Sequence, residues 1–241
     1  LESKGADGVA LEQAFVSTDL GGLTVSAGRM LNLLGFEADE PTGLLQYSKA
    51  YTSEWNPGSR YNDGIRGAFS QGDLSVAASV TDEYGTDPTR GTTTPGDADE
   101  LAFDIALSYS GIENLSISLG YADNSGDNAL RDLEIVNVHA SYSLGQLTLG
   151  GEYNDFELGT GEEADGYLLV ANYAVNDDLS ITVRHSEVDS DVALGANDEE
   201  KTTVAANYSV TDNLSTRVEY SSGELGTADN DVFAVEGIFT F

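Results

Sequence analysis

An alternating stretch near the carboxyl end constrains the fold more than any other part of the chain. Ala206–Ser221 reads ANYSVTDNLSTRVEYS, in which two runs alternate apolar and polar residues around the polar segment Thr211-Asp212-Asn213. A period of two residues places the apolar side chains on one face of a strand and the polar side chains on the other. The stretch is therefore predicted to be a β-hairpin with one apolar and one polar face.

The same unit recurs upstream, in Leu107–Tyr121, Ala140–Tyr153 and Ala171–Ser186. The tyrosines that lead the four units recur every 31 to 35 residues, a period that also occurs in solenoids and propellers. Here each unit is a plain hairpin, and the connections between units differ in length and sequence. The repeats therefore favour an all-β fold built from successive hairpins.

The connections between strands alternate between short turns and long polar loops, many of them acidic. This asymmetry is typical of a barrel that crosses the outer membrane with short periplasmic turns and longer extracellular loops. We therefore predict that residues 1–241 form one transmembrane antiparallel up-and-down β-barrel of about 14 to 16 strands. The chain offers 13 alternating runs, beginning with Val9–Thr18, and closure needs an even number. At least one further strand is therefore expected, in Leu1–Gly8, in Met30–Arg60 or, as we favour, before Leu1.

The net charge of the chain limits the classes of molecule that it can bind. The chain has 42 acidic and 10 basic residues, a net charge of −32, which argues against nucleic acid and favours cations and divalent bridges to anionic lipopolysaccharide. The absence of cysteine excludes disulfides and thiolate metal sites. The sequence contains no apolar run of 18 residues, so no transmembrane helix is predicted.

Tyrosines near both ends of the apolar runs are predicted to form two aromatic girdles at the membrane interfaces, in contact with outer-membrane lipid. Tyr109, Tyr142, Tyr173 and Tyr208 lie beside short turns, and Tyr121, Tyr153 and Tyr220 lie nearer the long loops.

Met30–Arg60 is the candidate functional segment, because it is too long and irregular for a simple turn. We expect it to fold into the lumen and narrow the pore, where arginines on one side would face carboxylates on the other. The predicted pore-lining residues are Arg66, Arg184, Arg217, Glu37, Asp39, Glu40, Lys49, Arg60, Glu152 and Glu219. Replacing Arg184 and Arg217 by alanine would then change ion preference and leave folding intact. Alternatively, the segment is an outer loop that packs on a neighbouring subunit.

No set of residues suggests catalysis. His139 and His185 lie on different predicted strands, and phosphate-binding loops and metal-binding histidine pairs are absent from the sequence. We therefore predict no enzyme activity, no required cofactor and no protein-bound metal centre. The acidic loops offer oxygen ligands for Ca²⁺, although such carboxylates are also often simply solvated. These loop residues are Asp97, Asp99, Glu100, Glu162, Glu163, Asp165, Asp189, Asp191, Asp198, Glu199 and Glu200.

Three short motifs carry a family resemblance. Ala27-Gly28-Arg29, Leu34-Gly35-Phe36-Glu37 and the YSKAY motif of residues 47–51 resemble the OmpL-like β-barrel porin-2 family of Gram-negative outer membranes. The terminal Phe241, with Phe239 two residues before it, looks like the carboxy-terminal signal that the outer-membrane assembly machinery reads. The resemblance implies a location in the Gram-negative outer membrane, and it makes a homotrimer a candidate assembly because trimers are common among porins.

The sequence therefore predicts a porin for passive diffusion of small hydrophilic solutes and ions, with a preference for cations from its acidic mouth. A second hypothesis is a non-conducting surface or structural barrel plugged by residues 30–60. A third is a secreted acidic β-protein that binds Ca²⁺, against which the alternation of turns and loops argues.

Overall fold

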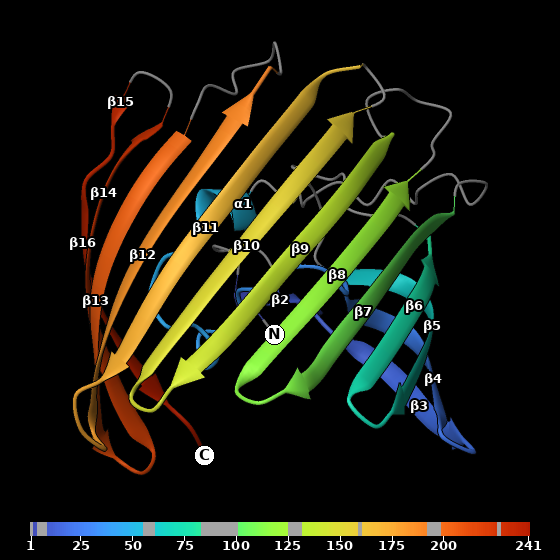
Figure 1. Cartoon of the computed structure of the whole chain (residues 1–241), viewed down its shortest axis with the longest axis horizontal. Helices are drawn as coiled ribbons and strands as arrows, with labels where there is room; N and C mark the ends of the chain where they lie inside the picture. Colours follow the sequence, from blue (N-terminus) through green and yellow to red (C-terminus); the bar gives the residue numbers. More distant parts are fainter. Residues whose placement is uncertain are drawn as a thin grey trace.

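A computed structural model of the chain describes residues 2–3, 9–54, 61–82, 101–124, 132–158, 161–191, 199–225 and 228–241. They form one 14-stranded sheet in which strands pair with their neighbours along the chain, so the predicted antiparallel up-and-down fold is confirmed (Figure 1). The sheet contains β3 (Ala14–Leu20), β4 (Leu23–Leu31), β5 (Tyr61–Gln71), β6 (Leu74–Thr81), β7 (Ala102–Ile112), β8 (Leu115–Asn124), β9 (Leu133–Leu144), β10 (Leu147–Leu158), β11 (Glu163–Ala174), β12 (Leu179–Ser190), β13 (Glu199–Thr211), β14 (Leu214–Leu225), β15 (Ala228–Asp229) and β16 (Val232–Phe239). Both β15 and β16 pair with β14.

The tight turns lie together at one end of the sheet, at the bottom of Figure 1. Short polar side chains close them by accepting backbone hydrogen bonds, which is why these residue types mark turns in the sequence. Asp19 accepts from the amides of Gly21 and Gly22, at 3.1 and 3.2 Å. Thr211 accepts from Asn213 and Leu214 in the same way, at 3.3 and 3.1 Å. The predicted hairpin Ala206–Ser221 is therefore present, as parts of β13 and β14.

Two strand boundaries differ from the sequence-based prediction. Val9–Thr18 is not one strand: β2 (Val9–Ala10) pairs with β1 (Glu2–Ser3) in a separate small sheet, and the main ladder begins at Ala14, opposite Arg29. Strand β5 begins at Tyr61, opposite Leu31, whereas the alternating pattern of the sequence predicts a strand only from Arg66 to Ser70. In both places pairing with a neighbouring strand, which the mixed local pattern does not reveal, sets the boundary.

The burial pattern is the reverse of that of a protein folded in water. Leu169 is 59% exposed, whereas Asp104, Arg184 and Glu219 are at most 2% exposed. In a water-soluble fold the apolar face of each strand would be the covered one. Here the apolar faces form an outer surface, and the polar faces of the strands line the inside of the sheet. No described helix is long and apolar enough to cross a membrane.

The two edges of the sheet run in the same direction. Strand β3 leads into the turn at residues 21–22, and β16 ends opposite Leu214, next to the turn at residues 212–213. Among the described residues, β3 and β16 do not pair with each other.

Neighbouring residues of β7 test which face meets lipid. Leu107 lies opposite Leu119 on the outer face, while Ser108 faces inward with its hydroxyl 2.8 Å from that of Ser118. We expect Leu107→Arg to lower the free energy of unfolding from lipid vesicles by about 2–4 kcal/mol, because it puts a charge into hydrocarbon. Ser108→Arg, at the same depth, should cost less than half as much. Urea unfolding of the two variants in vesicles measures the difference, and equal costs would contradict the assignment of the faces.

Candidate functional site

The candidate site is the β4–β5 loop, defined here as residues 32–54, which includes helix α1 (Tyr51–Glu54). The loop lies against the polar face of the sheet, and α1 is seen behind β10 and β11 in Figure 1. Two apolar clusters attach it: Leu34 packs with a group that includes Ile135 and Phe156, and Ala50 packs with Leu168 and Val170.

Two glycines of the sheet make room for loop side chains. A Cβ atom on Gly150 would lie 2.4 Å from Cζ of Phe36, and one on Gly120 would lie 2.8 Å from Cγ of Leu34. Both separations are too short for any larger residue unless the loop shifts. Glycine at these two positions therefore allows the loop to approach the sheet closely.

Arg184 of β12 is the most deeply buried cation at the site. Its guanidinium donates to Oε1 of Glu37 at 2.5 Å and to the carbonyl of Ser48 at 2.8 Å, and the side chain is fully buried. Burial by itself raises the pKa of the Glu37 carboxyl. The charge of Arg184, the amide of Ala50 and hydrogen bonds from Arg184 and Ser53 outweigh burial and lower that pKa below its ordinary value. Glu37 and Arg184 therefore form a charged pair between loop and sheet.

The Arg217 side chain of β14 binds backbone carbonyls in the next part of the loop. It donates to the carbonyls of Leu44 at 2.6 Å and Gln46 at 3.0 Å, and to Glu236 Oε2 at 3.0 Å. A planar guanidinium offers five donors in a fixed arrangement, so one arginine can satisfy several carbonyls of an irregular segment.

Carboxylates of the sheet complement these arginines by accepting from loop amides. Glu219 accepts from Tyr47 at 2.6 Å and from Ser48 at 3.1 Å. Glu152 accepts from Phe36 at 2.8 Å, and Asp104 accepts from Leu33 at 3.0 Å. Backbone groups with no secondary-structure partner are thus paired with charged side chains, which form stronger hydrogen bonds than neutral ones.

The remaining predicted site residues lie around the loop. Lys49 donates to Asp39 at 2.6 Å, and the Tyr61 hydroxyl donates to Asp39 as well and lies 3.5 Å from Glu40. Arg66 donates to Ser79 at 2.9 Å and to the carbonyl of Leu31. Arg60 lies outside the described residues.

The structure gives the arginines a different role from the one predicted. Arg184 and Glu37 are in direct contact beneath the loop and do not face each other across open space. Arg217 is 5% exposed and bound to loop carbonyls, so neither arginine is free to meet a solute from its present position. Because both guanidiniums bind the loop, we now expect alanine replacements to loosen it. The effect of these replacements on ion preference stays a prediction. A narrowing of the pore by residues 30–60 stays a prediction.

Several polar residues that hold or position the loop were not predicted from the sequence, and the four with long or acidic side chains are Asp104, Asn137, Asn154 and Asn207. Asn207 donates to the carbonyl of Leu45 at 2.8 Å, and Asn154 donates to the Thr52 hydroxyl at 2.9 Å. All four lie on polar faces otherwise rich in Ser, Thr and Gly. A long amide or carboxyl side chain at an inward position was the available signal.

The leading tyrosines occupy equivalent places in the sheet. Each pairs with the leucine that opens a strand after a short turn, and each is exposed on the outer face: Tyr109 with Leu74, Tyr142 with Leu115, Tyr173 with Leu147 and Tyr208 with Leu179. Nearer the long loops, Tyr153 pairs with Tyr167, Tyr220 pairs with Phe233 and the Tyr121 hydroxyl lies 3.4 Å from Asp123. The rings of Phe239 and Phe241 stack at 6.4 Å. Roles in membrane anchoring and assembly stay predictions.

Metal binding by the acidic loops also stays a prediction. Among the described residues, no group of three or more His, Cys, Asp or Glu side chains is placed to hold a metal ion. Asp97, Asp99, Glu100 and Asp198 lie outside the described part of the chain.

A comparison with family models shows to which family the chain belongs. The model of the Gram-negative porin family matches residues 1–228. The chain belongs to the Gram-negative porin family. A comparison with curated protein sequences gives no match. The expected porin family and the expected location in the Gram-negative outer membrane are thereby confirmed, and the secreted soluble alternative is set aside.

Solved structures show the same fold. Salmonella typhi OmpF, in complex with daunomycin, superposes with a TM-score of 0.72 at 13% identity, covering 94% of this chain and 77% of that one. OmpT of Vibrio cholerae gives 0.65 at 13% identity, covering 94% and 78%. The anion-selective porin from Comamonas acidovorans gives 0.63 at 16% identity, covering 92% and 73%. At these identities the comparison shows a shared porin fold.

The buried pair can be tested by removing one partner. We expect Arg184→Ala to destabilise the attached loop by about 3–5 kcal/mol, because it leaves Glu37 charged, buried and unpaired. Protease cleavage within residues 32–54 of the folded protein should become at least about tenfold faster, since each 1.4 kcal/mol is a factor of ten. The control is Arg29→Ala, which removes an exposed 3.2 Å pair with Asp63 and should cost less than about 1 kcal/mol. Equal effects of the two variants would contradict the role of Arg184.

The lowered pKa of Glu37 sets the sign of a pH effect. The carboxyl is ionised in the folded state at a lower pH than the ordinary value of 4.5. Its contribution to loop attachment is therefore complete above that value and is lost as the pH falls through the lowered folded-state pKa. We expect cleavage of the loop by an acid-active protease to accelerate at about pH 3 relative to about pH 6. Glu37→Gln should remove part of this acceleration, and an identical pH profile in the variant would exclude Glu37 as its source.

Proposed function

We propose that this porin is an open channel through which small hydrophilic solutes and ions diffuse passively. The observation that carries the proposal is the position of the β4–β5 loop, which lies along the inner face of the sheet. Its amides donate hydrogen bonds to Asp104 on β7, Glu152 on β10 and Glu219 on β14. A segment held against the wall narrows a lumen and leaves a path beside it. Polar inner faces of the strands supply a wetted surface along that path.

We further propose that the channel prefers cations. Two of the four arginines expected to line the pore are bound beneath the loop, Arg184 by Glu37 and Arg217 by Glu236 and loop carbonyls. With those positive charges paired, the excess of 42 acidic over 10 basic residues controls the potential that an ion meets.

The partners of the proposed channel follow from its location. Outer-membrane lipid and lipopolysaccharide would contact the apolar surface, and the assembly machinery would bind the Phe239 and Phe241 end of the chain. We propose a homotrimer as the assembled form; one of the matching structures, OmpT of Vibrio cholerae, is described as a trimer. We propose no chemical reaction for the channel and no required cofactor; Ca²⁺ on the acidic loops remains part of the proposal.

Conductance in a planar bilayer tests the function directly. Under a KCl gradient we expect discrete current steps with a reversal potential on the K⁺ side. Anion preference would keep the channel and overturn the assignment of its selectivity to the acidic excess. Absence of steps from folded protein would favour the non-conducting barrel plugged by its own loop. Circular dichroism of the same sample should show β structure, so that a missing current is not mistaken for unfolded protein.

A further inference from the structure

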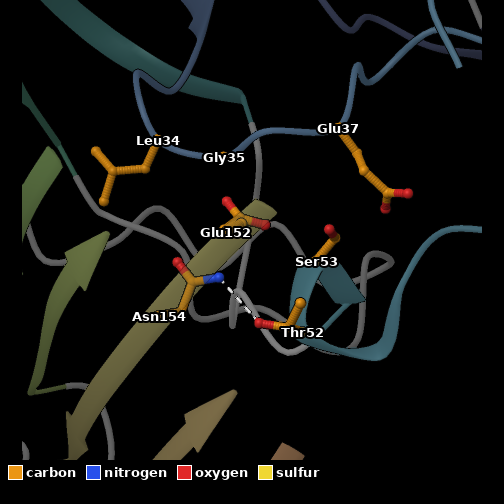
Figure 2. Close-up of a pocket in the computed structure, with 7 residues that line it drawn as sticks. All are labelled: Leu34, Gly35, Glu37, Thr52, Ser53, Glu152 and Asn154. Atoms are coloured by element: carbon orange, nitrogen blue, oxygen red, sulfur yellow. Dashed lines mark hydrogen bonds between the residues drawn. The ribbon is translucent and has the colours of Figure 1, made fainter. Parts of the chain in front are cut away.

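A small pocket lies between the β4–β5 loop and strand β10. It is lined by Leu34, Gly35, Glu37, Thr52, Ser53, Glu152 and Asn154. Figure 2 shows the carboxyl groups of Glu37 and Glu152 and the hydroxyl group of Ser53 around one space, with Asn154 bonded to Thr52 beside it. The pocket therefore lies where the loop contacts the sheet.

Glu152 is the residue of this pocket that the protein leaves incompletely paired. It is 5% exposed, and its Oε1 atom accepts from the Phe36 amide at 2.8 Å and from Asn137 Nδ2 at 2.7 Å. Its Oε2 atom is buried and has no hydrogen-bond partner among the residues that the structure describes. A carboxylate oxygen without a partner is costly to bury, and a protonated Oε2 would equally lack an acceptor. An occupant from outside the protein chain would remove this cost.

The charges around the pocket leave one negative charge uncompensated. Glu37 is paired with Arg184 at 2.5 Å, so that charge is balanced. Glu152 is close enough to Glu37 for the two carboxylates to repel each other. His139 lies opposite Glu152 in the ladder, with Nδ1 3.1 Å from Asn137 Oδ1. A neutral imidazole there supplies no positive charge, so within the described part of the chain no salt bridge balances ionised Glu152.

We propose that this pocket binds a single monovalent cation, with Na⁺ as the species tested. The carboxylate of Glu152 and the hydroxyls of Thr52 and Ser53 are oxygen donors, the type that hard cations select. One positive charge balances Glu152, whereas a divalent ion would leave a buried positive excess. Because Thr52 and Ser53 belong to the loop and Glu152 belongs to β10, the bound cation fastens the loop to the sheet. This proposal does not depend on whether the channel conducts.

Thermal unfolding in detergent tests the site. The measurement is made at pH 8, where a histidine side chain with an ordinary pKa of about 6.5 is neutral. The midpoint temperature of unfolding of the wild-type protein should rise with NaCl concentration and then reach a plateau. It should not rise with N-methylglucamine chloride of equal ionic strength, because binding to the folded state alone is what stabilises. Glu152→Gln should abolish the difference between the two salts, with at least about a tenfold loss in Na⁺ affinity.

Glu219→Gln is the matched control. Glu219 is equally buried and accepts loop amides through its carboxylate, but it does not line this pocket. This variant should lower the midpoint in both salts and keep the Na⁺ dependence. The proposal is overturned if the wild type shows no Na⁺ dependence, if Glu152→Gln retains it, or if Mg²⁺ or Ca²⁺ replaces Na⁺ at lower concentration.

A direct measurement covers the case in which Glu152→Gln fails to fold. Sodium NMR line broadening by the wild-type protein should saturate and should be reversed by competing K⁺, while Thr52→Val should weaken it. A stability that varies with pH but not with Na⁺, without line broadening, would show that a proton or a water molecule occupies the pocket, and would overturn the proposal.

Discussion

Pairing of backbone hydrogen-bond groups away from water is the constraint on which this structure depends. Within the hydrocarbon region, strands can pair their amides and carbonyls only with neighbouring strands, which produces the continuous ladder from β3 to β16. The β4–β5 loop lies on the inner face of the same sheet and has almost no ladder of its own. Its amides and carbonyls are paired instead with side chains of the sheet, which explains why charged residues occur at inward positions.

Because charged side chains of the sheet are bound to the loop, they are not available to attract a solute in the channel. Arg184 and Arg217 would be strong anion-attracting groups if they faced an open lumen, but the loop covers both. The desolvation cost of a buried pair such as Arg184 and Glu37 is large, and such a pair is weak evidence of stability in itself. The pair has a clearer effect on the position of the loop. Each guanidinium bonds to particular carbonyls and so fixes one path of the loop along the wall. The loop and the charge distribution of the pore therefore depend on each other.

The sequence was sufficient for the fold because a period of two residues determines which face of a strand is apolar. Ala206–Ser221 and its three relatives predicted hairpins that the structure contains, and Leu-led strands after short turns placed the tyrosines correctly beside those turns. The same pattern could not show which inward residues meet the loop. Arg66, Arg184 and Arg217 share an inward position in their strands, yet they bind Ser79, Glu37 and Leu44 respectively. Those partners depend on the path of an irregular segment, which has no period to read.

Glu152 and Glu219 illustrate how far identical sequence signals can diverge. Both are inward glutamates, both are nearly fully buried, and both accept amides of the loop. Glu219 uses Oε1 and Oε2 together on Tyr47 and Ser48, whereas Glu152 leaves Oε2 unpaired above a pocket. The middle of the loop, from Leu44 to Ser48, is thus fixed by protein contacts through Arg217 and Glu219. The amino half, from Leu33 to Glu37, is bound to Asp104 and Glu152 through its amides and to Arg184 through the Glu37 carboxylate. Of these three contacts, only the one between Phe36 and Glu152 would respond to the cation that we propose beside Glu152.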